Sequence, residues 1–226
     1  MDMELYAGTM SRYYTQNGIA KDEDEQTNWT AEEAHDTVGK WQERILPELS
    51  REGEPPYEPW NEDEEDAYTA HMGWEAFGAL LLCTACGVYK QPIPNTLHAG
   101  WDFEADPTIG RLIEDRTQVW SLFQGATCWL PLADCFYFKA TMPDGETAVV
   151  GTLPGLKTEL NRINELGWQA DEQTILGWAE TEGYPAVEAE QEQAYETASL
   201  AKYAFSLLWH AAAFAEQHHT PIILKP

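Results

Sequence analysis

The sequence predicts an α+β fold, mostly helical, in which helices cover a small mixed or antiparallel sheet. Apolar residues recur at helical spacing along several segments, the longest running from residue 187 to residue 215. Two aromatic and β-branched runs flank a Pro-Asp-Gly turn within residues 135–152, a pattern typical of a β-hairpin. The 226 residues are 43% hydrophobic and show no repeat or low-complexity linker, so we expect a single domain over residues 1–226.

The first third of the chain predicts a strand, a helix and an extended stretch. Residues 5–15 are rich in Tyr and Thr and low in charge, which favours a strand. Thr30 precedes Glu33 by three residues, so the pair forms a capping box for a helix that ends near Pro47. Three prolines within residues 53–59 predict an extended chain.

The middle of the chain predicts a second helix, a long connection and a short third helix. Asn61 and Glu64 have the capping spacing, which predicts a second helix starting there and ending at Gly87. Residues 90–110 are rich in Pro and Gly and predict a long connection, and residues 111–123 predict a short helix. The buried face of the second helix is expected from Ala70, Trp74, Phe77 and Leu81.

The C-terminal third predicts three helices and a strand after the hairpin. Residues 154–167 carry one amphipathic helix, and Asp171 caps another. An Ala-rich stripe from residue 187 predicts a long central helix that ends at His218 and His219. Residues 222–224 then predict a buried strand.

The charge balance excludes several kinds of partner. The chain has 39 acidic and 13 basic residues, a formal net charge of −26, and residues 1–66 contain 19 of the acids and five of the bases. Nucleic acids and anionic membranes attract basic proteins, so neither is an expected partner. No basic, apolar leader and no run long enough to span a bilayer is present, so we expect a cytoplasmic protein.

Cysteine and histidine patterns offer only weak signs of chemistry. Cys83 and Cys86 have the spacing of a zinc knuckle that Cys128 and Cys135 would complete, but the first pair ends an apolar run, so we expect reduced thiols in the core. His98 lies near Asp102 in the 90–110 connection, where the pair would suit a small metal-dependent or hydrolytic enzyme. No nucleophile or standard motif accompanies them, and we expect no metal or cofactor.

The strongest candidate site combines aromatic and acidic residues in the first third of the chain. An aromatic anchor surrounded by charges is typical of a binding hot spot that faces a basic partner. The alternative is that the tryptophan packs against the helix start and the acids form a solvated face. The predicted partner-binding residues are Tyr57, Trp60, Glu62, Asp63, Glu64, Glu65 and Asp66.

Several segments resemble a group of bacterial proteins of unassigned activity. The matching segments are residues 3–9 (MELYAGT), 12–14 (RYY), 129–131 (WLP), 150–153 (VGTL) with 156–160 (LKTEL), and 213–224 (AFAEQHHTPIIL). An immunity role against a toxin is a common suggestion for such groups. The resemblance therefore implies a toxin-neutralising protein and brings no catalytic residue with it.

Together these observations favour a non-enzymatic, acidic cytosolic protein that neutralises a basic protein by covering its surface, and a bacterial toxin is the expected partner. The first alternative is the small enzyme centred on His98 and Asp102. The second is a DNA mimic, whose charges would lie at phosphate-like intervals on an elongated face. The oligomeric state is left open by the sequence.

Overall fold

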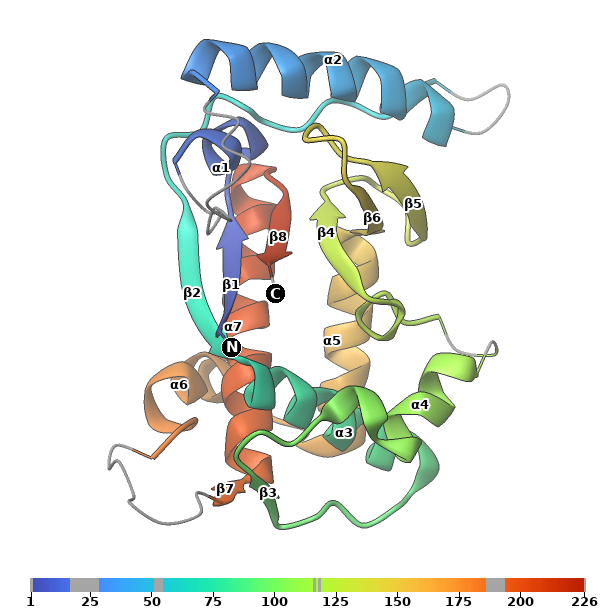
Figure 1. The fold of residues 1–226 in the computed structure, drawn as a ribbon, viewed down its shortest axis with the longest axis vertical. Coiled ribbons are helices and arrows are strands. Elements are labelled where there is room, and N and C mark those ends of the chain that lie inside the picture. The colour runs from blue at the N-terminus through green and yellow to red at the C-terminus, as the bar shows by residue number, and fades with distance from the viewer. Residues whose placement is uncertain are drawn as a thin grey trace.

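The computed structural model describes residues 2–16, 29–50, 55–115, 117, 119–185 and 194–225. Its main sheet has six strands in the order β2-β1-β8-β4-β6-β5 (Figure 1). Neighbouring strands are antiparallel except β4 and β6, which are parallel, so the sheet is mixed, as predicted. The six strands are β1 (Asp2–Ala7), β2 (Tyr68–Gly73), β4 (Ala126–Leu130), β5 (Tyr137–Thr141), β6 (Thr147–Thr152) and β8 (Ile222–Lys225). A separate small sheet pairs β3 (Thr96–His98) with β7 (Ala194–Glu196).

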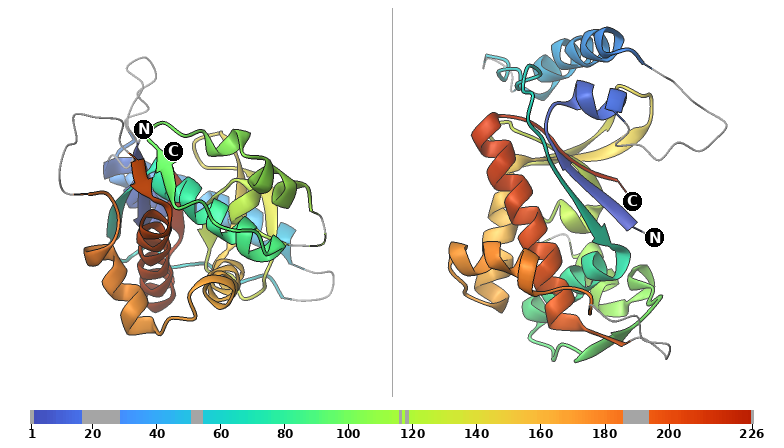
Figure 2. Two further views of the ribbon diagram at one scale, coloured as in Figure 1. Left: turned by 90° about the horizontal axis from the view of Figure 1, so that it is seen from below. Right: turned by 90° about the vertical axis from the view of Figure 1, so that its left-hand side faces the viewer.

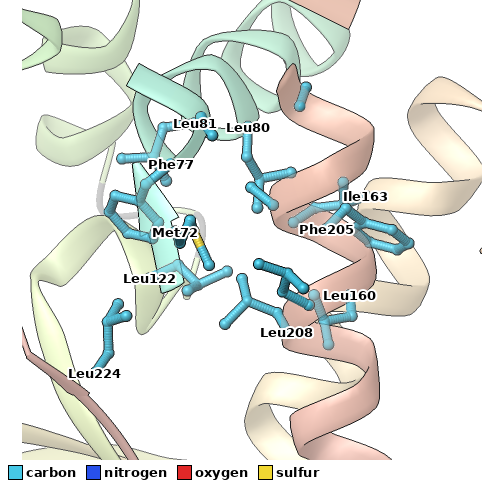
Figure 3. Packing of buried hydrophobic residues seen from close by; sticks show 14 of the residues in the cluster. Met72, Phe77, Leu80, Leu81, Leu122, Leu160, Ile163, Phe205, Leu208 and Leu224 are labelled. Atoms are coloured by element: carbon cyan, nitrogen blue, oxygen red, sulfur yellow. The ribbon is translucent and has the colours of Figure 1, made fainter. Parts of the chain in front are cut away.

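Three long helices share one apolar core with a face of the main sheet: two lie against the strands, and the first in sequence crosses these two beside the end of β2 (Figure 1). They are α3 (Trp74–Tyr89), α5 (Leu153–Gly167) and α7 (Thr197–His218), with α6 (Glu172–Thr181) beside α7. Figure 2 shows α5 and α7 on the same side of the strands. Alternate strand residues such as Leu5, Trp129 and Leu224 join the helices in a large apolar cluster, which we call the first core (Figure 3). The long central helix predicted from the Ala-rich stripe is therefore confirmed.

The opposite strand residues belong to a second, smaller core. Tyr6, Cys128, Val150 and Ile223 face this side of the sheet. Their cover comes from α1 (Met10–Gln16), from α2 (Ala31–Leu49) and from Trp60 in the irregular segment 55–66. In Figure 1, α2 lies across one end of the molecule, beyond the ends of the strands.

Several sequence predictions are confirmed together with their physical cause. Thr30 and Glu33 form the expected capping box of α2, and the Asp171 side chain accepts a hydrogen bond from the Thr174 amide at the start of α6. The hairpin is formed by β5 and β6, with Gly145 at a positive φ of 90° in its turn. The predicted C-terminal strand is β8.

The strand predicted over residues 5–15 is wrong in its second half. The strand ends at Ala7, and a short helix follows from Met10. The chain turns at Gly8, whose amide donates to the Pro221 carbonyl, while the Tyr6 hydroxyl donates to the Thr9 carbonyl. The partner that caps the new helix is Glu62, more than 50 residues away, so local sequence contained no sign of it.

The helix predicted from Asn61 to Gly87 is wrong in its first part, and Ala70, expected on its buried face, lies in β2. Residues 61–67 are irregular, residues 68–73 form β2, and α3 begins only at Trp74. Asn61 does not cap a helix start, because its amide and side chain both donate to carbonyls at the end of α7. The predicted stop at Gly87 is close: α3 continues to Tyr89 and ends at Lys90, which has a positive φ of 54°.

The remaining differences concern element boundaries. The expected helix over residues 111–123 is α4 (Pro107–Glu114), capped by Asp106, followed by a 3-10 helix over Leu122–Gln124. The long connection also contains β3 and a 3-10 helix over Phe103–Ala105. The central helix begins at Thr197, and Ala194, predicted to belong to it, lies on the strand β7 instead. Residues 186–193, where the start was predicted, lie outside the described residues.

Candidate functional site

The predicted acidic site lies at the end of the molecule that α2 covers. Segment 55–66 runs alongside α2, and the turn between β5 and β6 approaches the same helix (Figure 1). The Gln42 Nε2 donates to the Trp60 carbonyl at 3.2 Å, and the Trp41 Nε1 donates to the Thr141 carbonyl at 2.7 Å. The three elements therefore form one connected surface.

Exposed carboxylates from all three elements gather on this surface, which we call the acidic end. Its Lys and Arg side chains, within the described part of the chain, are Arg12, Lys40, Arg44 and Lys139, and Lys40 is paired with Asp36 one turn earlier on α2. Acids therefore outnumber bases here, and the surface favours a cationic partner. The carboxylates of the acidic end are Glu32, Glu33, Asp36, Glu43, Glu48, Glu58, Asp63, Glu65, Asp66, Asp144 and Glu146.

The predicted anchor Trp60 is not on the surface. Its side chain is 3% exposed and packs edge-on against Trp41, with ring centroids 5.5 Å apart. Its indole Nε1 donates to Glu62 Oε1 at 2.7 Å. The prediction of an exposed aromatic hot spot at Trp60 is therefore wrong, because the ring fills the second core beneath α2.

Glu62 also has an internal role. Its two carboxylate oxygens accept hydrogen bonds from the backbone amides of Met10 at 3.1 Å and Ser11 at 2.8 Å. These amides begin α1 and lack partners within that helix. A carboxylate at this position also interacts favourably with the helix dipole, so Glu62 stabilises α1 and holds the segment against it.

Glu64 joins the segment to the end of α7. Its Oε2 lies 2.7 Å from Nδ1 of His218, whose ring stacks on Phe214 with centroids 4.2 Å apart. The hydrogen bond with His218 lowers the pKa of the Glu64 carboxyl. The neighbouring Asn61 donates to the carbonyls of His218 and His219, so the last turn of α7 is capped by this segment.

The other predicted residues are more accessible. Asp63, Glu65 and Asp66 are exposed, and Asp63 lies 3.8 Å from the His35 ring of α2. Tyr57 is half-buried, and its hydroxyl donates to Asp134 at 2.7 Å. Sequence reasoning missed the carboxylates of α2 and of the hairpin turn, although the polar face of α2 was visible in its spacing.

The alternative site around residues 90–110 does not bring catalytic groups together. His98 is exposed on β3, where it pairs with Ala194, and the Asp102 side chain accepts from the Glu104 amide. Asp102 thus caps a 3-10 turn. Among the residues that the structure describes, no group of three or more His, Cys, Asp or Glu side chains is placed to hold a metal ion.

The cysteines do not converge either. Cys83 and Cys86 lie in the first core and Cys128 in the second, while Cys135 is exposed. Burial raises the pKa of Cys83 to about 12, which keeps that thiol protonated at neutral pH. The prediction of core thiols is confirmed for these three residues.

A buried carboxylate that sequence reasoning missed lies on α5. Glu159 is 6% exposed and accepts from the backbone amides of Ser121 at 2.6 Å and Leu122 at 3.1 Å. Burial raises its pKa to about 7, although the hydrogen bonds oppose that shift. Its position between Leu156 and Leu160 on the buried face of the helix was the available signal.

Comparison with known proteins finds no matching family model, no similar curated protein and no similar solved structure. In the described part of the chain, no helix has the length and apolar character needed to cross a membrane.

Proposed function

We propose that this chain is a non-enzymatic binding protein that neutralises a basic protein partner through the acidic end. The observation that carries the proposal is the concentration of exposed carboxylates on α2, on segment 58–66 and on the β5–β6 turn, in a chain of net charge −26. Complementary charge raises the association rate and excludes acidic competitors.

The rigidity of the surface supports the same function. The Glu62 and Glu64 side chains and the Trp60 ring hold segment 55–66 in place, so Asp63, Glu65 and Asp66 are presented from a fixed backbone. A preorganised surface loses less conformational entropy on binding than a flexible acidic tail would. The internal acids of this segment therefore position the external ones.

A toxin is the basic partner that we propose, and the protein would act as its immunity protein in the cytoplasm. The sequence resemblance to a bacterial group with a suggested immunity role supports this assignment. The four cysteines are free thiols, as expected in a reducing compartment.

Retention of proteins from a lysate of the native cells tests the proposal with two matched variants. The first combines Glu43→Gln, Glu48→Gln and Glu65→Gln at the acidic end. The second removes the same number of charges from exposed carboxylates at the opposite end of the molecule. Its substitutions are Glu104→Gln, Glu114→Gln and Glu180→Gln.

The wild type and the opposite-end variant should retain the same basic protein, and retention should fall as ionic strength rises. The acidic-end variant should retain several-fold less. Equal retention by the two variants, or retention that is indifferent to salt, would contradict the proposal. Co-expression with the captured partner then tests neutralisation, because a toxin should stop growth only in the absence of the functional acidic end.

A further inference from the structure

A groove outside the acidic end lies between α5 and α7. It consists of two adjoining cavities of about 240 and 360 Å³. Both cavities are lined by Lys157 and Asn161 of α5 and by Glu216 of α7. Together they have a volume within the usual range of small-molecule sites, roughly 300–1,000 Å³.

An ion pair stands where the two cavities meet. The Lys157 ammonium donates to the Glu216 carboxylate, and the two side chains are 37% and 61% exposed. A pair this exposed contributes little to stability, so a ligand can replace either partner at small cost.

The two cavities differ in charge. The smaller cavity holds two carboxylates, Glu172 of α6 and Glu216, against the one ammonium of Lys157, and it adds the indole of Trp209, so it suits an ammonium group. The larger cavity adds the His219 ring to Lys157 and Asn161, which makes it suitable for a carboxylate. Apolar residues line both, among them Leu160 and Ala212 in the smaller cavity and Leu132 and Leu153 in the larger.

We propose that this groove binds a small zwitterionic molecule that carries an ammonium group and a carboxylate on an aliphatic stem. The ammonium lies between Glu172 and Glu216 on the Trp209 ring, and the carboxylate pairs with Lys157 and His219. A lone anion is disfavoured by the net charge of −26 and by Glu216, which lines both cavities, and a lone cation gives the Lys157 ammonium, which also lines both cavities, no new partner. A zwitterion offers a new partner to each member of the pair.

Three probes of equal chain length test the proposal: 6-aminohexanoate, hexylammonium and hexanoate. Binding is measured at low salt by the shift of the Trp209 indole signal in NMR spectra, assigned with Trp209→Phe. The zwitterion should bind at least about tenfold more tightly than either probe with a single charge. The proposal is overturned if a single-charge probe binds as tightly, or if the zwitterion leaves the Trp209 signal unchanged.

Two variants assign the ends of the ligand. Glu172→Gln should weaken 6-aminohexanoate about three- to tenfold and leave hexanoate unaffected, while Lys157→Gln should weaken the zwitterion and leave hexylammonium no weaker. The controls are Glu180→Gln on the same helix as Glu172, and Lys90→Gln, both at exposed positions outside the groove lining. An equal loss in a control would show a general charge effect and overturn the proposal.

Discussion

The face of the sheet under α3, α5 and α7 differs from the face under α1 and α2 in what holds its cover in place. On the first face, regular helices contribute apolar side chains to a continuous core, as Phe205 does between α7 and α6. On the second face, α2 also contributes apolar side chains, but part of the cover is a short helix and an irregular segment, which hydrogen bonds between distant residues attach, as Glu62 does with Met10.

The difference explains how one chain tolerates so many acids. The carboxylates of Glu62 and Glu64 have partners within the protein. Glu62 accepts from the Met10 amide at the start of α1, and Glu64 is hydrogen-bonded to the His218 ring at the end of α7. Their neighbours Asp63, Glu65 and Asp66 point outward from the same short segment. Alternating acids thus hold the second face together and form part of its outer surface.

The largest expected effect comes from breaking the first core. Phe205 is fully buried and its ring lies 5.1 Å from Trp168 and 5.7 Å from Trp209 between centroids. Phe205→Ala should lower the free energy of unfolding by about 3–5 kcal/mol, measured by urea denaturation, because a large cavity remains. Leu166→Ala, at a residue 39% exposed, is the control and should cost under about 1 kcal/mol. Similar losses in the two variants would contradict the packing described.

The second effect concerns Glu159, the only buried carboxylate among the residues that the structure describes. The pKa of Glu159 is about 7 in the folded protein and 4.5 ordinarily, so the folded state holds this proton more strongly than the unfolded state. Its contribution to stability is therefore fully present below pH 4.5 and is lost as pH rises through 7.

Over that interval the wild type should lose up to about 3 kcal/mol relative to Glu159→Gln, which has no proton to release. The check is urea unfolding of both proteins at several pH values from 4.5 to 8. The difference between the two proteins cancels the titration of the other acids. A difference that stays constant with pH would show that Glu159 does not titrate in this range.

The third effect tests whether polar bonds hold the second face. Glu62→Gln retains the shape of the side chain but removes the charge that both α1 amides and the Trp60 indole contact. The free energy of unfolding should fall by about 1–2 kcal/mol, as for loss of a helix cap. Hydrogen exchange at Met10 and Ser11 should accelerate. Glu65→Gln, three residues on and exposed, should change neither quantity, and an equal effect there would exclude the specific role of Glu62.

Elements that depend on nearby residues could be predicted from the sequence, and elements that depend on contacts between distant residues could not. Three predicted features depend on residues only a few positions apart, so the sequence pattern was enough to predict them. They are the capping box at Thr30, the hairpin turn at Gly145 and the helix that carries Leu156 and Leu160. The helix expected at Asn61 failed because Asn61 bonds to carbonyls more than 150 residues away. At the candidate site, spacing along the sequence does not distinguish inward Glu62 from outward Asp63, so the inward role of Glu62 could not be predicted.

The smallest expected effect on stability comes from Lys40→Gln at the acidic end, a change that should alter binding more than folding. Lys40 pairs with Asp36 on the exposed side of α2, and Lys40→Gln should lower the free energy of unfolding by no more than about 0.5 kcal/mol. The same change removes a positive charge from the surface proposed to meet a basic protein. Affinity for that partner should therefore rise at low ionic strength, and the gain should disappear at high salt because mobile ions screen exposed charges.

Lys90→Gln, at the end of α3, changes the net charge equally and should leave the affinity unchanged. If both variants gain equally, the partner responds to total charge, and the acidic end has no special part in recognition.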